Sequence, residues 1–162
     1  MRALTETDIR GSFVNASRKE IADLALPLDF AETDWASRDF YGWRDRKAPM
    51  RGAVVVELGD RLVGVSLRRA DAKPRTRAQC SWCQDVELTR EVVFYAAKRA
   101  GDAGRRGDTV GTLVCADFGC PANVRRNPSV AYVGFDVEAA RGARIEGLAE
   151  RVRGFAASVL GE

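Results

Sequence analysis

The sequence of 162 residues contains no histidine. Histidine is the commonest general base near neutral pH, so its absence excludes Ser-His-Asp and Cys-His catalytic arrangements. Zinc-enzyme sites that depend on imidazole ligands are excluded for the same reason. An enzyme of an unrecognised type is therefore the weakest functional hypothesis, and we expect no small-molecule substrate.

Long apolar runs are also missing. No stretch approaches the roughly 18 apolar residues of a membrane-spanning helix. The first residues, MRALTETDIRGSF, include acidic side chains and lack the apolar segment of a secretory signal. We therefore expect a cytoplasmic protein with no membrane partner.

Lysine is scarce, with 4 lysines against 22 arginines. This ratio is typical of a high-GC genome and is not by itself a nucleic-acid signature. The net charge is +3, whereas a general polyanion binder usually has a larger basic excess. The apolar content of 46% indicates a globular chain.

Local patterns predict an α+β fold. Two capping boxes, Thr5 with Asp8 and Ser17 with Glu20, predict short helices within residues 1–29, and we expect Pro27 to end the second. The aromatic residues of 30–51 should pack under these helices. We expect Gly42 and Pro49 to interrupt regular structure there.

Alternating apolar residues predict two hairpins. Residues 54–58 and 62–67 are β-rich runs, and Gly59-Asp60 between them fits a type II′ turn. Residues 91–98 and 109–115 form a second pair, joined by a glycine-rich stretch that we expect to be a flexible loop. A short helix should then begin near Phe118 with Asp117 as its N-cap.

The last segment predicts a long helix over residues 136–160. Five apolar residues recur at steps of three and four: Ile145, Leu148, Val152, Phe155 and Val159. This stripe is typical of a helix that packs on the core, and a dimer seam is the alternative. We interpret the chain as a single domain, 1–162, with segments 1–29, 30–77, 78–128 and 136–160.

The four cysteines occur as two pairs at metal-ligand spacing. Cys80 and Cys83 form a Cys-x2-Cys knuckle, and Cys115 and Cys120 follow 31 residues later. Zinc prefers a tetrahedral set of thiolates from such pairs. The first pair precedes a hairpin, and the second joins a strand end to a helix start. Knuckle, hairpin and helix together predict a treble-clef zinc finger.

Other interpretations of the cysteines are disulfides, a redox dithiol and unrelated buried thiols. Disulfides need an oxidising compartment, and a thioredoxin-like pair would begin a helix in a βαβ unit. We favour one structural Zn²⁺ ion. Four thiolates close its coordination shell, whereas a catalytic ion keeps one position open.

Basic residues lie close to this predicted site in the sequence. They offset its negative charge, or they form a face for an acidic protein surface or ribosomal RNA. The set comprises Arg77, Lys98, Arg99, Arg105, Arg106, Arg125 and Arg126.

Three sequence runs resemble the carboxy-terminal treble-clef domain of elongation factor G-binding proteins, the family that includes fusidic-acid-resistance proteins. They are GWRDRKAPMRG (Gly42–Gly52), CSWCQDV and DTVGTLVCADFGC (Asp108–Cys120), and the likeness covers roughly residues 8–128. The resemblance implies that the four cysteines bind zinc. It also implies binding to elongation factor G, which such proteins release from a drug-stalled ribosome. The alternative is a ribosome- or RNA-binding zinc module.

Overall fold

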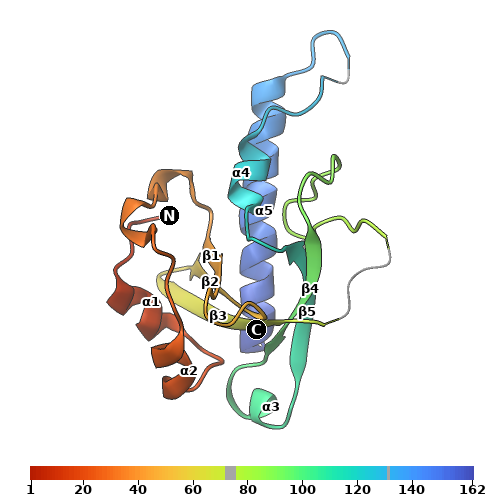
Figure 1. Cartoon of the computed structure of the whole chain (residues 1–162). Helices are drawn as coiled ribbons and strands as arrows, with labels where there is room; N and C mark the ends of the chain where they lie inside the picture. The colour runs from red at the N-terminus through yellow and green to blue at the C-terminus, as the bar shows by residue number, and fades with distance from the viewer. Residues whose placement is uncertain (72–75, 131) are drawn as a thin grey trace.

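The computed structural model describes residues 1–71, 76–130 and 132–162. One antiparallel sheet with strand order β1-β2-β3-β4-β5 organises these residues. Its strands are β1 (Tyr41–Arg44), β2 (Arg51–Leu58), β3 (Arg61–Arg69), β4 (Val92–Lys98) and β5 (Thr109–Cys115). The helices are α1 (Glu6–Ser12), α2 (Arg18–Asp23), α3 (Gly101–Arg105), α4 (Cys120–Arg125) and α5 (Val137–Leu160). The α+β prediction, with short N-terminal helices and a long C-terminal helix, is confirmed (Figure 1).

Both N-terminal helices begin at the predicted capping boxes. The Thr5 and Ser17 side chains each accept from the backbone N–H three residues on, and Asp8 and Glu20 complete the boxes. The end predicted at Pro27 is wrong, because α2 stops at Asp23. The next residue, Leu24, takes an extended conformation and turns into the core, where it is 4% exposed.

The aromatic stretch is more regular than predicted. It contains two short 3-10 helices, Phe30–Glu32 and Trp35–Ser37, and then β1, which includes Gly42. Gly42 does not interrupt the strand, because its missing side chain makes room for a packed ring. A Cβ at this position would lie 2.8 Å from the Cβ of Phe118.

The two predicted hairpins form, and they join into one sheet. Gly59 has φ +59° at the β2–β3 turn, as a type II′ turn requires. The two hairpins meet through the pairs Arg68↔Ala96 and Arg69↔Tyr95. The glycine-rich connection is not a plain loop, since it contains α3, which begins at Gly101 with φ +64°.

Each face of the sheet carries its own apolar cluster. Ile9 of α1 and Leu24, which follows α2, pack with Tyr41 and Trp43 on one face. The predicted stripe of α5 packs on the opposite face, where Leu148 and Val152 are fully buried, so the core-packing interpretation is confirmed. Within the described residues, no helix has the length and apolar character needed to cross a membrane.

Candidate metal centre

Four cysteines that are distant in sequence meet at one end of the β4–β5 hairpin. Cys80 and Cys83 lie in the turn before β4, Cys115 is the last residue of β5, and Cys120 is the first residue of α4. Each is at most 2% exposed. Their sulfur atoms all lie within 4.8 Å of one another, so the structure gathers the four residues that the spacing singled out.

The sulfur positions fit a tetrahedral zinc ion. The Sγ atoms of Cys80 and Cys120 are 3.6 Å apart, and those of Cys83 and Cys115 are 3.7 Å apart. Four thiolates at about 2.3 Å from one ion would be separated by about 3.8 Å, whereas a disulfide requires about 2.05 Å. The cluster therefore fits one structural zinc ion whose four positions are all filled by protein sulfur.

The first cysteine pair is held by backbone hydrogen bonds. The Cys83 N–H donates to Cys80 Sγ at 3.5 Å, and the Gln84 N–H donates to the Cys80 carbonyl at 2.9 Å. The Ser81 N–H donates to the Leu113 carbonyl of β5 at 2.8 Å. The knuckle is thus fixed to the strand that supplies the third cysteine.

The second pair differs from its prediction in one respect. Helix α4 begins at Cys120 with Gly119 as N-cap, not near Phe118 with Asp117 as N-cap. Asp117 instead accepts from the Gly119 N–H at 3.0 Å and forms an ion pair with Arg90. Phe118 has φ +55° and is 2% exposed, so the turn directs its ring into the core before the helix starts.

The thiols influence one another's protonation. Hydrogen bonds from Cys115 and then Cys120 lower the pKa of Cys80 to about 7. The same two thiols hold the pKa of Cys83 far below its usual range. Hydrogen bonding with Cys115 and then Cys80 raises the pKa of Cys120. A divalent cation removes this competition among the four thiols for protons, because it binds all four sulfurs as thiolates.

Asn123 completes the centre, and sequence reasoning missed it. It is 1% exposed, and its Nδ2 donates to the sulfurs of Cys83 and Cys115 at 3.5 and 3.6 Å. Its Oδ1 accepts from Arg90 Nε at 2.9 Å and Arg126 Nη2 at 2.8 Å. The two guanidinium groups thereby orient the amide and place positive charge near the thiolates. The sequence feature that could have identified Asn123 is its position one helical turn after Cys120.

Three of the predicted basic residues lie near this centre, and all three bond within the chain. Arg125 makes a two-pronged pair with Asp39 at 2.6 and 3.1 Å. Arg126 contacts Asn123, as described above. Arg77 Nη2 donates to the Leu88 carbonyl at 2.7 Å. These side chains support the zinc module's structure.

The other four predicted basic residues lie elsewhere. Lys98 pairs with Thr109 at one end of the β4–β5 ladder, whereas Cys115 pairs with Val92 at the other. Six residues of strand separate the two ends by about 20 Å. Arg99, Arg105 and Arg106 follow Lys98 around α3. The seven basic residues therefore do not form one surface beside the zinc centre.

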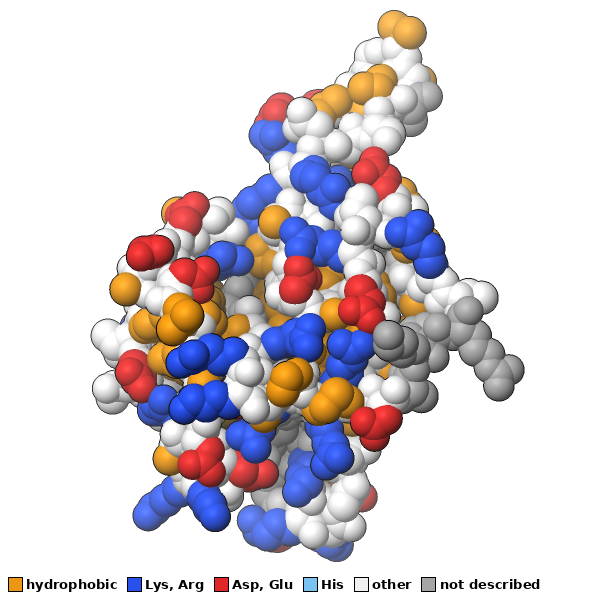
Figure 2. Space-filling view, in the orientation of Figure 1, with side chains coloured by type: hydrophobic (Ala, Val, Ile, Leu, Met, Phe, Trp, Pro, Cys, Tyr) orange, Lys and Arg blue, Asp and Glu red, His pale blue; other side chains and the backbone are white. Residues whose placement is uncertain are grey.

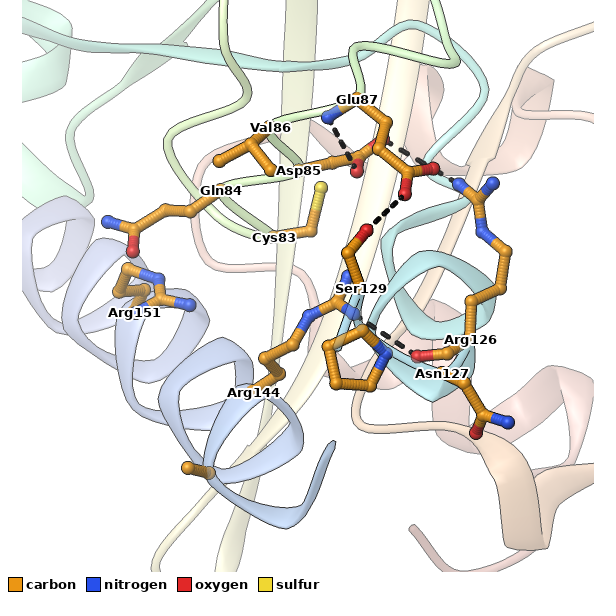
Figure 3. Close-up of a pocket in the computed structure, with 12 residues that line it drawn as sticks. Cys83, Gln84, Asp85, Val86, Glu87, Arg126, Asn127, Ser129, Arg144 and Arg151 are labelled. Carbon is orange, nitrogen blue, oxygen red and sulfur yellow. Dashed lines mark hydrogen bonds and ion pairs between the residues drawn. The ribbon is translucent and has the colours of Figure 1, made fainter. Parts of the chain in front are cut away.

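A cavity of about 420 Å³ opens beside the metal centre. Residues 83–87 line one side, and the segment after α4, residues 126–129, and one face of α5 line the other (Figure 3). Arg126 pairs with Asp85 at 3.6 Å, and the Ser129 hydroxyl lies 3.5 Å from Glu87 Oε1. These contacts tie the segment after Cys83 to the segment after α4.

Two arginines of α5 hold the same walls in place. Arg144 donates to the carbonyls of Asn123 and Arg126 at 3.0 and 3.1 Å, at the carboxyl end of α4. Arg151 Nε donates to the Trp82 carbonyl at 2.6 Å, inside the knuckle. The long helix therefore braces both cysteine-bearing segments.

The fold and the four-sulfur centre define a treble-clef zinc-finger protein. The family described as FBP C-terminal treble-clef zinc-finger matches residues 8–159, and the chain belongs to this family. The match continues through α5, beyond the residues 8–128 that the sequence motifs indicated.

No curated protein matches the chain in sequence. Among solved structures, the fusidic acid resistance protein FusC is similar at 20% sequence identity with a TM-score of 0.49. The likeness covers 65% of this chain and 47% of FusC. The chain thus spans about half the length of FusC, and a likeness this low supports no further conclusion.

Proposed function

We propose that this chain is a non-catalytic binding protein that uses its zinc module to bind elongation factor G in the cytoplasm. The observation that carries the proposal is membership of the treble-clef family over residues 8–159. Two of the three motifs that resemble elongation factor G-binding proteins contain the two cysteine pairs. Recognition and metal binding therefore depend on the same segment.

A non-catalytic role agrees with the chemistry of the metal centre. Four sulfur ligands leave no position on zinc for water or substrate. The ligand atoms are buried, and Asn123 covers two of them. The ion's role is then to fix the surrounding backbone, because structural zinc contributes binding free energy directly to folding.

The surface we assign to the partner is the segment that follows Cys83. Val86 is 81% exposed, while Asp85 and Glu87 on either side of it are held by Arg126 and Ser129. An exposed apolar side chain on a rigid, polar-rimmed turn suits a protein interface. Zinc controls this surface because Cys83 immediately precedes it.

Release of the factor from the ribosome would follow from differential affinity. A binder that prefers a factor conformation with poor fit to the ribosome shifts the population toward that conformation. The free energy of this population shift is at most the difference between the binder's binding free energies for the two conformations.

Size-exclusion chromatography tests the proposal. The zinc-loaded chain and purified elongation factor G should co-elute at tens of micromolar and separate after zinc is removed with a chelator. The V86D variant should weaken the complex. L28D is a matched control, because Leu28 is also an exposed aliphatic residue, at 83%, and lies in the N-terminal segment outside the zinc module. Separate elution of the zinc-loaded wild-type chain contradicts the proposal.

The alternative, an RNA-binding zinc module, was based on the basic residues near the cysteines. Five of these seven bond within the chain: Arg77, Arg99, Arg105, Arg125 and Arg126. This set therefore gives the alternative no specific support.

A further inference from the structure

A second cleft lies on the sheet face opposite α5. Its volume is about 300 Å³, and its walls come from α2, the segment before β2, and strands β3 and β4. We call it the β3–β4 cleft. It shares no lining residue with the cavity beside the metal centre.

Three cations converge in the β3–β4 cleft. Arg51 of β2 and Arg68 of β3 are directly opposite in the ladder, and Arg68 pairs in turn with Ala96 of β4. Lys98 follows Ala96 by two residues and so lies on the same face. Side chains directly opposite have Cβ atoms about 4.5–5.5 Å apart, and like charges there repel.

The charge of these cations is poorly balanced inside the chain. Among the described residues, neither Arg68 nor Lys98 has an ion-pair partner, and both are exposed. Arg51 is 3.9 Å from Asp45, which is buried. The single acidic residue among the described lining residues is Glu20, whose pKa is lowered by hydrogen bonds from Ser17 and also by the charges of Lys98 and Arg51, so it offsets one of the three positive charges. The cleft therefore presents surplus positive charge.

The floor of the cleft is rigid. Asn15 bridges the two strands, because its Nδ2 donates to the carbonyls of Ser66 and Lys98 at 3.0 and 2.9 Å. Its Oδ1 accepts from the Ser66 N–H at 2.8 Å. The spacing between Arg68 and Lys98 is thereby fixed before any ligand binds, which lowers the entropic cost of binding.

An aromatic ring lies on the same face. Phe94 precedes Ala96 by two residues on β4 and is 42% exposed, although it is a large apolar side chain. Its ring covers Gly111 of β5, where a Cβ would lie 2.1 Å from the ring. Figure 2 shows basic side chains gathered across the middle of the molecule, with apolar side chains among them.

We propose that the β3–β4 cleft binds single-stranded nucleic acid, with a phosphate held by Arg51, Arg68 and Lys98 and a neighbouring base stacked on Phe94. Guanidinium groups bind phosphate oxygens through two parallel hydrogen bonds. Exposed aromatic rings beside a basic groove stack on unpaired bases of any sequence. An acidic protein segment would bind the cations but make no use of the exposed Phe94 ring. A duplex would offer that ring no unpaired base to stack on.

Fluorescence anisotropy with the zinc-loaded full chain tests this assignment. The probe is a labelled ten-nucleotide single-stranded RNA of mixed sequence, titrated from 50 to 200 mM salt. The R68Q/K98Q variant should bind at least tenfold more weakly. Its log–log salt slope should become shallower by about 0.7, since one neutralised phosphate on a single strand contributes about 0.7. F94L keeps an apolar side chain without a ring and should weaken binding about tenfold.

The control is R2Q/R61Q, which removes the same charge from two arginines outside the cleft and should bind RNA nearly as the wild-type chain does. Three outcomes overturn the proposal: no RNA binding at 50 mM salt, equal loss in the control, or an unchanged F94L. A poly-glutamate peptide is also added as a competitor. If it displaces the labelled RNA as strongly as unlabelled RNA does, the cleft is reassigned to acidic proteins. R68Q/K98Q should still co-elute with elongation factor G, so the two proposals can fail separately.

Discussion

The metal centre and the β3–β4 cleft are both surrounded by arginines, but they use them differently. Arg125 and Arg126 beside the cysteines bond to Asp39 and Asn123. Arg68 in the cleft has no ion-pair partner within the described chain, and it faces Arg51 across the ladder. Basic residues close to a site in sequence thus indicate little about partners. Whether their charge is balanced inside the fold is more informative.

The largest difference between the two regions should appear on loss of the metal. Structural zinc contributes apparent free energies of about 10–16 kcal/mol in small zinc peptides. C83S should therefore abolish zinc binding and unfold the segment between the cysteine pairs. Native mass spectrometry and hydrogen exchange can measure both effects, and S81A is the neighbouring control because Ser81 is exposed.

Hydrogen exchange should also show how far this unfolding spreads. Residues of α1 and α2 pack in a separate cluster with Tyr41 and Trp43, so their protection should survive better than that of β4 and β5. Equal protection loss in both regions would show that the zinc module and the N-terminal region unfold as one unit.

A smaller effect should follow from removing the amide that contacts the sulfurs. N123A deletes the donor to Cys83 and Cys115 and releases Arg90 and Arg126. Groups that orient metal ligands typically change metal affinity by 10–100-fold, and we expect a loss in this range. Competition with a chromophoric chelator measures it. N127A is the control, since Asn127 is exposed; a loss as large in N127A would argue against the role of Asn123.

Sequence patterns predicted the elements whose determinants are local. The capping boxes of Thr5 and Ser17, the Gly59 turn and the stripe of α5 each depend on residues a few positions apart, and all appear in the structure. The cysteine pairs also belong to this group, because ligand spacing is a local property. These features correctly predicted an α+β treble-clef protein.

Features that depend on distant contacts were predicted incorrectly or missed. Gly42 lies in β1 because Phe118, 76 positions later, fills the space beside it. Asn123 donates to Cys83, 40 positions earlier, and accepts from Arg90, 33 positions earlier, so both contacts exist only in the folded chain. The joining of two hairpins through Arg68↔Ala96 also has no local signal. Tertiary packing decides each of these cases.

The smallest expected effects come from replacing one arginine in each region, which compares the two regions directly. R125Q breaks the two-pronged pair with Asp39, whose side chain is 7% exposed, and should lower the free energy of unfolding by about 1–2 kcal/mol. R68Q removes a charge that faces Arg51 and should change that free energy by less than about 0.5 kcal/mol. Urea unfolding of the zinc-loaded chains measures both. A larger loss in R68Q than in R125Q would show that Arg68 supports the fold, and the cleft would then lose its main argument for a ligand.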